Sequence, residues 1–73
     1  MKVKAFLAVL AAEPLAYRIV RQTGSHRILE APGRRQLVVA FHGREVPSYL
    51  VRRILVADAG LTVEEALEVI RRA

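Results

Sequence analysis

A histidine follows a glycine–serine pair in the most arginine-rich part of this sequence, in the run Arg21-Gln22-Thr23-Gly24-Ser25-His26. Imidazole is the side chain whose ordinary pKa best suits proton transfer near neutral pH. The planar guanidinium of arginine presents donors that match phosphate oxygens. A proton-transfer group among phosphate-binding groups indicates chemistry on a nucleic acid. The plainer interpretation is an ordinary turn at Gly24-Ser25 and a surface histidine at the start of a strand.

Positive charge is concentrated in the middle of the chain. Residues 18–53 carry eight arginines and two glutamates, a formal charge of +6, whereas the whole chain carries +5. Such a segment favours a polyanion or an acidic partner.

The composition predicts one small domain, residues 1–73, without disulfides or metal. There is no cysteine, and the two histidines and seven carboxylates are not clustered. No apolar run approaches the roughly 18 residues that span a membrane. The first apolar run is interrupted by Glu13 and Pro14, so we interpret it as core and not as a leader peptide. We expect a cytoplasmic protein with no cofactor and no membrane association.

Apolar periodicity and turn residues predict the secondary structure. A helix is expected over residues 2–12, strands over 17–22, 26–31 and 36–41, and a helix over 46–59 with Pro47 in its first turn. Thr62 and Glu65 form a predicted capping box that starts a third helix over about 62–72. The fold class is α+β, in the order α-β-β-β-α(-α). Short connections make the sheet antiparallel, with helices on one face and solvent or a partner on the other.

Four motifs, spread over most of the chain, together resemble the pattern of a known protein family. These are the Arg21–His26 run, the Pro32-Gly33 hairpin, His42-Gly43, and Arg52-x-Ile54-Leu55-x-x-Ala59-Gly60-Leu61. Together they resemble the HicA family of toxins over about residues 3–61, which leaves the third helix as a C-terminal extension.

The resemblance implies a fold like the double-stranded-RNA-binding domain and a small ribonuclease that cuts messenger RNA. It also implies inhibition by a HicB-like antitoxin and a catalytic role for His26. The chain departs from the family pattern at several positions. Ala16 replaces a glycine, Tyr17 replaces a tryptophan, Ala40 replaces a proline, and Tyr49-Leu50 replaces Gly-Thr.

RNA can be cut without metal when its 2′-hydroxyl attacks the adjacent phosphate. The reaction needs a base, an acid and cations that stabilise the charged phosphorane. His26 is the candidate base or acid, and Gly24 is expected to have a positive φ. The candidate RNA-binding residues are Arg21, Ser25, Arg27, Arg34, Arg35 and Arg52.

Several of these roles have structural alternatives. Ser25 could donate to phosphate or bond its own turn. Arg52, like Arg53, could grip phosphates or lie on a solvated helix face. His42 could transfer a second proton, although closing the third strand is the favoured interpretation. Tyr17 could stack on a base, although a core position is favoured.

The pattern also does not decide which face of the sheet carries His26, because Ile28 and Leu29 are both apolar. Tyr49 and Leu50 form a candidate antitoxin contact, or they pack against the third helix.

Two main functions remain open. The first is a metal-independent endoribonuclease toxin, with RNA and a HicB-like antitoxin as partners and a homodimer also compatible. The alternative is a basic RNA-binding domain of the same fold that cuts nothing. A third, weaker option is an interaction subunit whose basic face docks an acidic protein.

Overall fold

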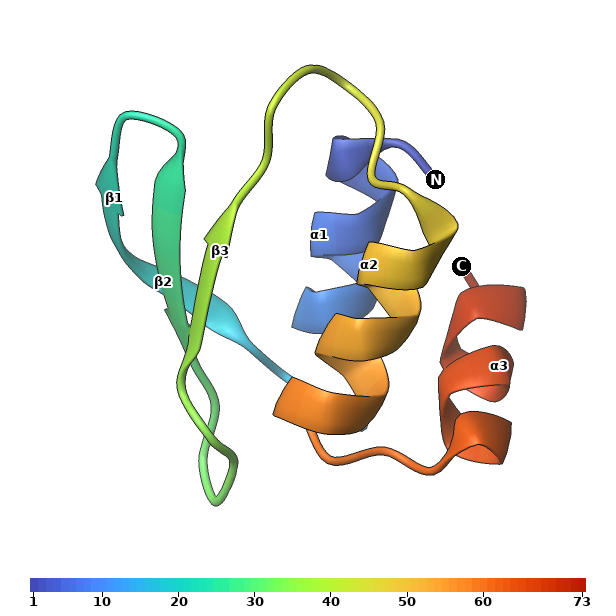
Figure 1. The fold of residues 1–73 in the computed structure, drawn as a ribbon. Helices are drawn as coiled ribbons and strands as arrows, with labels where there is room; N and C mark the ends of the chain where they lie inside the picture. Colours follow the sequence, from blue (N-terminus) through green and yellow to red (C-terminus); the bar gives the residue numbers. More distant parts are fainter.

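The computed structural model describes residues 1–73, and its element order confirms the predicted α+β class (Figure 1). Its elements are α1 (Val3–Ala11), β1 (Arg18–Thr23), β2 (His26–Glu30), β3 (Leu37–Ala40), α2 (Ser48–Arg53), a turn of π-helix, η1 (Ile54–Asp58), and α3 (Val63–Arg71). The predicted boundaries lie within two residues of these. The predicted second helix is correct in extent, but its second half is π-helical. No helix has the length and apolar character needed to cross a membrane.

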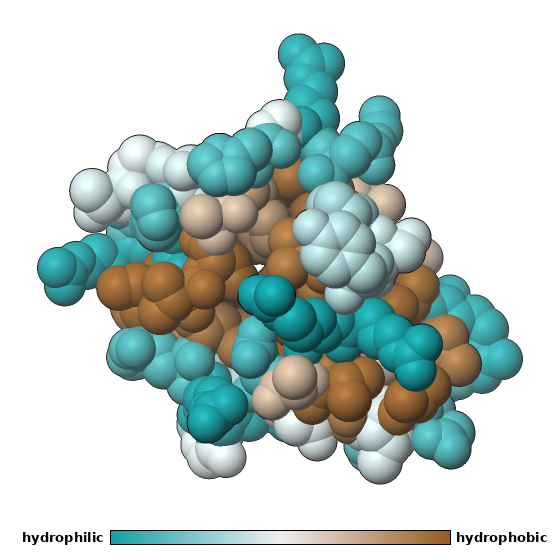
Figure 2. Space-filling model, viewed as in Figure 1, coloured by the Kyte–Doolittle hydropathy of each residue, from teal (hydrophilic) through white to brown (hydrophobic).

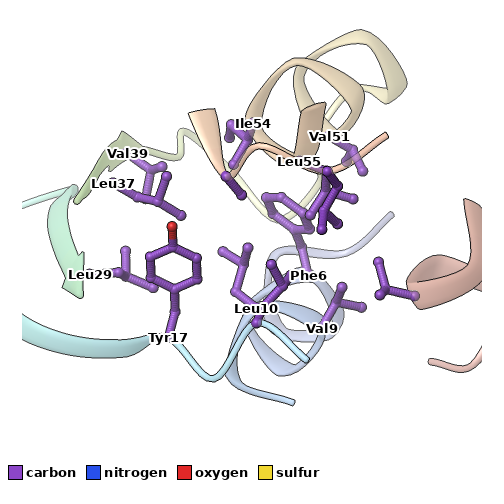
Figure 3. Packing of buried hydrophobic residues seen from close by; sticks show 14 of the residues in the cluster. Phe6, Val9, Leu10, Tyr17, Leu29, Leu37, Val39, Val51, Ile54 and Leu55 are labelled. Atoms are coloured by element: carbon purple, nitrogen blue, oxygen red, sulfur yellow. The ribbon is translucent and has the colours of Figure 1, made fainter. Parts of the chain in front are cut away.

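The elements form three layers, with the sheet on one side, α1 and α2 in the middle and α3 outside (Figure 1). The core contains 18 buried residues, and all of them are hydrophobic. Leu29 and Leu37 of the sheet point toward the ring of Tyr17, and Leu10 of α1 lies on the other side of that ring (Figure 3). α3 adds Ala66 and Val69 to this core. The third helix therefore packs on the side of α1 and α2 that faces away from the sheet.

The sheet has the order β1-β2-β3, and its register defines its two faces. Leu29 pairs with Leu37, and both are buried against the helices. Because side chains alternate along a strand, His26 and Ile28 lie on the opposite, open face. The sequence left this choice undecided, and the burial of Leu29 decides it.

The chain enters β1 through a residue with unusual backbone geometry. Ala16 has a φ of +57°. Its N–H donates to the carbonyl of Ala12, and the N–H of Tyr17 donates to the carbonyl of Leu10 at 2.8 Å. These bonds hold the connection between α1 and β1 in a conformation that costs an L-residue energy.

The predicted capping box at the start of α3 is confirmed. The Glu65 N–H donates to Thr62 Oγ1 at 3.1 Å, and the Thr62 N–H donates to Glu65 Oε1 at 2.8 Å. The hydrogen bond from the Thr62 backbone, with a further contribution from its hydroxyl, lowers the pKa of the Glu65 carboxyl. The ionised carboxylate therefore stabilises the start of α3.

Candidate active site

His26 is the first residue of β2, directly after the β1–β2 turn. It pairs with Thr23 of β1 on one side and with Ala40 of β3 on the other. Gly24 of the turn has a φ of +59°, which confirms the expected positive φ. The His26 side chain is exposed on the open face of the sheet, so a bound strand could reach its imidazole.

Two arginines of β1 share that open face with His26. Arg21 pairs with Ile28, and Arg18 pairs with Glu30. Directly paired residues of antiparallel strands have side chains on the same face. The sequence predicted Arg21 as a site residue but missed Arg18. A bulge between Ile19 and Arg21 restores Arg18 to the open face, and no local sequence signal marks this bulge.

Arg27 lies next to His26 in sequence but on the other face of the sheet. Its guanidinium carbon is 6.0 Å from the ring centroid of Phe41, and that ring packs edge-on against Phe6. This distance permits a cation–π interaction, which fixes one positive charge at the His26 end of the sheet. Ser25, in the turn beside it, is half-buried.

Arg34 and Arg35 lie at the opposite end of the sheet, in the loop that connects β2 to β3 (Figure 1). β2 rises about 3.3 Å per residue over its five residues, which separates the two ends by roughly 15 Å. The structure therefore does not bring these arginines to His26. A contact between Arg34 or Arg35 and RNA at that distant end stays a prediction.

The guanidinium of Arg34 ties two loops together. Nη1 donates to the carbonyl of Ala59 at 3.1 Å, and Nη2 donates to the carbonyl of Pro14 at 3.4 Å. Arg34 thus has a structural contact that sequence analysis did not foresee.

Tyr17 is a core residue, as the favoured interpretation of the sequence predicted, and its side chain is only 2% exposed. Its hydroxyl donates to the carbonyl of Arg35 at 2.6 Å. Burial raises the pKa of the Tyr17 phenol; the charge of Arg34 acts against this shift and that of Asp58 adds to it. The ring is not available for stacking on a base.

Arg52 and Arg53 lie on different sides of α2. Arg52 lines a cavity between α2 and α3, together with Val51 and Leu67. Arg53 lines a cavity between α2 and β3, together with Ala40. Arg53, which was not among the predicted site residues, is therefore the one that faces the sheet.

The apolar pair at the start of α2 does not pack against α3. The Tyr49 side chain is 71% exposed, and Leu50 is half-buried beside β3. His42 is exposed in the loop after β3, which ends at Ala40. No three His, Cys, Asp or Glu side chains come together in a group that could hold a metal ion.

The comparison with protein families supplies an independent finding. A family model described as the HicA toxin of bacterial toxin–antitoxin systems matches residues 5–61, so α3 lies outside the match. No curated protein and no solved structure was found to match. Because the matched segment covers well over half of the 73 residues and includes His26 and its neighbours, the chain belongs to the HicA toxin family.

Proposed function

We propose that this toxin is a metal-independent endoribonuclease that cuts messenger RNA in the cytoplasm until a HicB-like antitoxin binds it. The observation that carries the proposal is the position of His26 on the open face of the sheet, beside Arg21 and Arg18 on the neighbouring strand. This arrangement offers one proton-transfer group and two cations to a single RNA strand.

The proposed mechanism starts with the RNA 2′-hydroxyl. As its oxygen attacks the adjacent phosphorus, a base takes the hydroxyl proton, and an acid protonates the departing 5′-oxygen. His26 acts as one of these two groups. Arg21 and Arg18 stabilise the negative charge that develops on the phosphorane oxygens. The products are a 2′,3′-cyclic phosphate and a free 5′-hydroxyl.

One observation favours the alternative of RNA binding without cleavage. No hydrogen bond within the protein orients the His26 ring, whereas a catalytic imidazole is often oriented by a third group. In the proposed enzyme the bound RNA supplies the contact that orients the His26 ring.

The test compares His26→Ala with His42→Ala, a matched change at the other histidine. We expect His26→Ala to lower the cleavage rate by about 10²–10⁴, as is typical for loss of a general acid or base. Growth and messenger RNA integrity are followed after induction, and cleavage by the purified proteins is followed in excess chelator.

Cleavage by His26→Ala at the wild-type rate would refute the catalytic assignment. Loss of wild-type activity in chelator, restored by magnesium, would refute the metal-independent mechanism.

A further inference from the structure

The two edges of the sheet differ in how well they are protected. β1 is interrupted by a bulge and carries Arg18 and Arg21, features that discourage pairing with another strand. β3 (Leu37–Ala40) is regular and uncharged, and Val38 on it is 63% exposed. In an antiparallel sheet alternate residues of an edge strand direct their N–H and C=O groups outward. No backbone group outside the sheet bonds to those of β3.

A groove runs along this free edge. A cavity of about 220 Å³ separates β3 from the second helix, and six of its eight lining residues are hydrophobic. They are Val38, Val39, Ala40 and Phe41 on the strand side, and Leu50, Arg53, Ile54 and Asp58 on the helix side. Hydrophobic surface lies over the strands, beside strongly hydrophilic side chains near the middle of the molecule (Figure 2).

The π-helical turn shapes the helix side of the groove. The Ala59 N–H donates to the carbonyl of Ile54 at 2.8 Å, a bond between residues five apart. In such a turn residues five apart lie on the same side of the helix. Arg53 and Asp58 are five apart, and both line the groove. Neither forms an ion pair within the protein.

We infer that this groove receives an extended, acidic segment of the antitoxin, which adds to β3 as a fourth strand. The inference rests on the proposed function only in naming the antitoxin as the source of the segment. Main-chain hydrogen bonds to β3 would supply affinity. Alternate apolar side chains of the segment would enter the groove, and an acidic side chain would meet Arg53.

The groove favours a peptide over RNA. Its lining is mostly aliphatic, whereas proteins that bind single-stranded RNA present aromatic side chains for base stacking. The free edge offers backbone groups in the spacing of a β-strand, which a peptide matches.

Charge favours an acidic partner over a second copy of this chain. Each copy carries a formal charge of +5, so two copies repel each other. An acidic segment gains attraction from the same charges.

The first experiment uses the purified protein encoded beside this toxin gene as the antitoxin. We expect Arg53→Glu to weaken its binding by about tenfold or more, as reversal of a charge in a buried contact does. Arg52→Glu is the matched control, since Arg52 faces α3, and it should leave the affinity within about threefold. Hydrogen exchange of the Val38–Ala40 amides should slow in the complex. Equal effects of the two substitutions, or unchanged exchange in β3, would overturn the inference.

A second experiment does not depend on the toxin having ribonuclease activity. A synthetic peptide of alternating glutamate and valine, with blocked ends, is titrated into the protein and followed by amide chemical shifts. We expect the shifts to concentrate at β3, with weaker binding by Arg53→Glu and no binding of the lysine–valine counterpart. Preference for the lysine peptide, protection of β3 by self-association, or protection by an RNA oligonucleotide instead would each overturn the inference. Failure of RNA cleavage alone would refute the proposed function and leave this result standing.

Discussion

At the scale of single residues, the two arginines of the β2–β3 loop have different surroundings. Arg34 bonds the carbonyls of Ala59 and Pro14, whereas the Arg35 side chain is exposed. Hydrogen bonds from a charged group are worth about 1.5–3 kcal/mol when buried, and Arg34 is only half-buried. We therefore expect Arg34→Ala to lower the free energy of unfolding by about 1–2 kcal/mol, measured by urea denaturation. Arg35→Ala is the control, and an equal loss in both would show that the Arg34 contacts contribute nothing.

Ala16 offers a test of backbone strain. A left-handed conformation costs an L-residue about 1–2 kcal/mol, and glycine removes this cost while gaining freedom in the unfolded chain. The balance predicts that Ala16→Gly stabilises the protein by up to about 1 kcal/mol. Thermal denaturation measures the change. Ala11→Gly, in the last turn of α1, should destabilise instead, and a loss of stability in both variants would contradict the prediction.

At the scale of secondary structure, the start of α3 should depend on pH. The folded-state pKa of Glu65 is lowered from its ordinary value of 4.5. The stabilisation by its carboxylate is therefore complete above that value and is lost as the pH falls through the lowered pKa. We expect wild type to melt above Glu65→Gln at neutral pH and the gap to close in acid. Glu64→Gln, outside the capping box, should show a smaller effect of pH.

Elements with local signals could be predicted, and features set by tertiary packing could not. The helix limits followed from Pro14, Gly60 and the Thr62 cap, which act on neighbouring residues. Which face of the sheet carries His26 depends on the side on which α1 and α2 pack. The sequence does not show this side, because Ile28 and Leu29 are both apolar and point to opposite faces. The distance between Arg34 and His26 likewise depends on the folded structure, because the two residues lie at opposite ends of β2.

At the scale of the whole molecule, α3 forms part of the core although the family match ends before it. Val69 is buried, whereas Leu67 on the same helix is 62% exposed. We expect Val69→Asp to destabilise the protein by several kcal/mol, because it buries an unpaired charge. Leu67→Asp should change stability by only about 0.5 kcal/mol. Equal stability of the two variants in urea would show that α3 is not docked.

The charge distribution of the molecule predicts a strong effect of salt on RNA binding. Each phosphate contact contributes about −0.7 to the slope of log K against log salt for single strands. Replacing Arg18 and Arg21 by glutamine should flatten the slope by about 1.4 and weaken binding to all sequences alike. An unchanged slope would place the RNA away from the open face of the sheet.

The π-helical turn at Ile54–Asp58 bears on how this helix tolerates a change of length. A π-helical turn holds one residue more than the α-helical turn that it replaces. Deletion of Ala57 would place Ala59 four residues after Ile54, so the bond from the Ala59 N–H to the Ile54 carbonyl would close an ordinary α-helical turn. Ala59 would then keep the carbonyl to which Arg34 donates. The helix is therefore expected to lose one residue here without losing its contact with the β2–β3 loop.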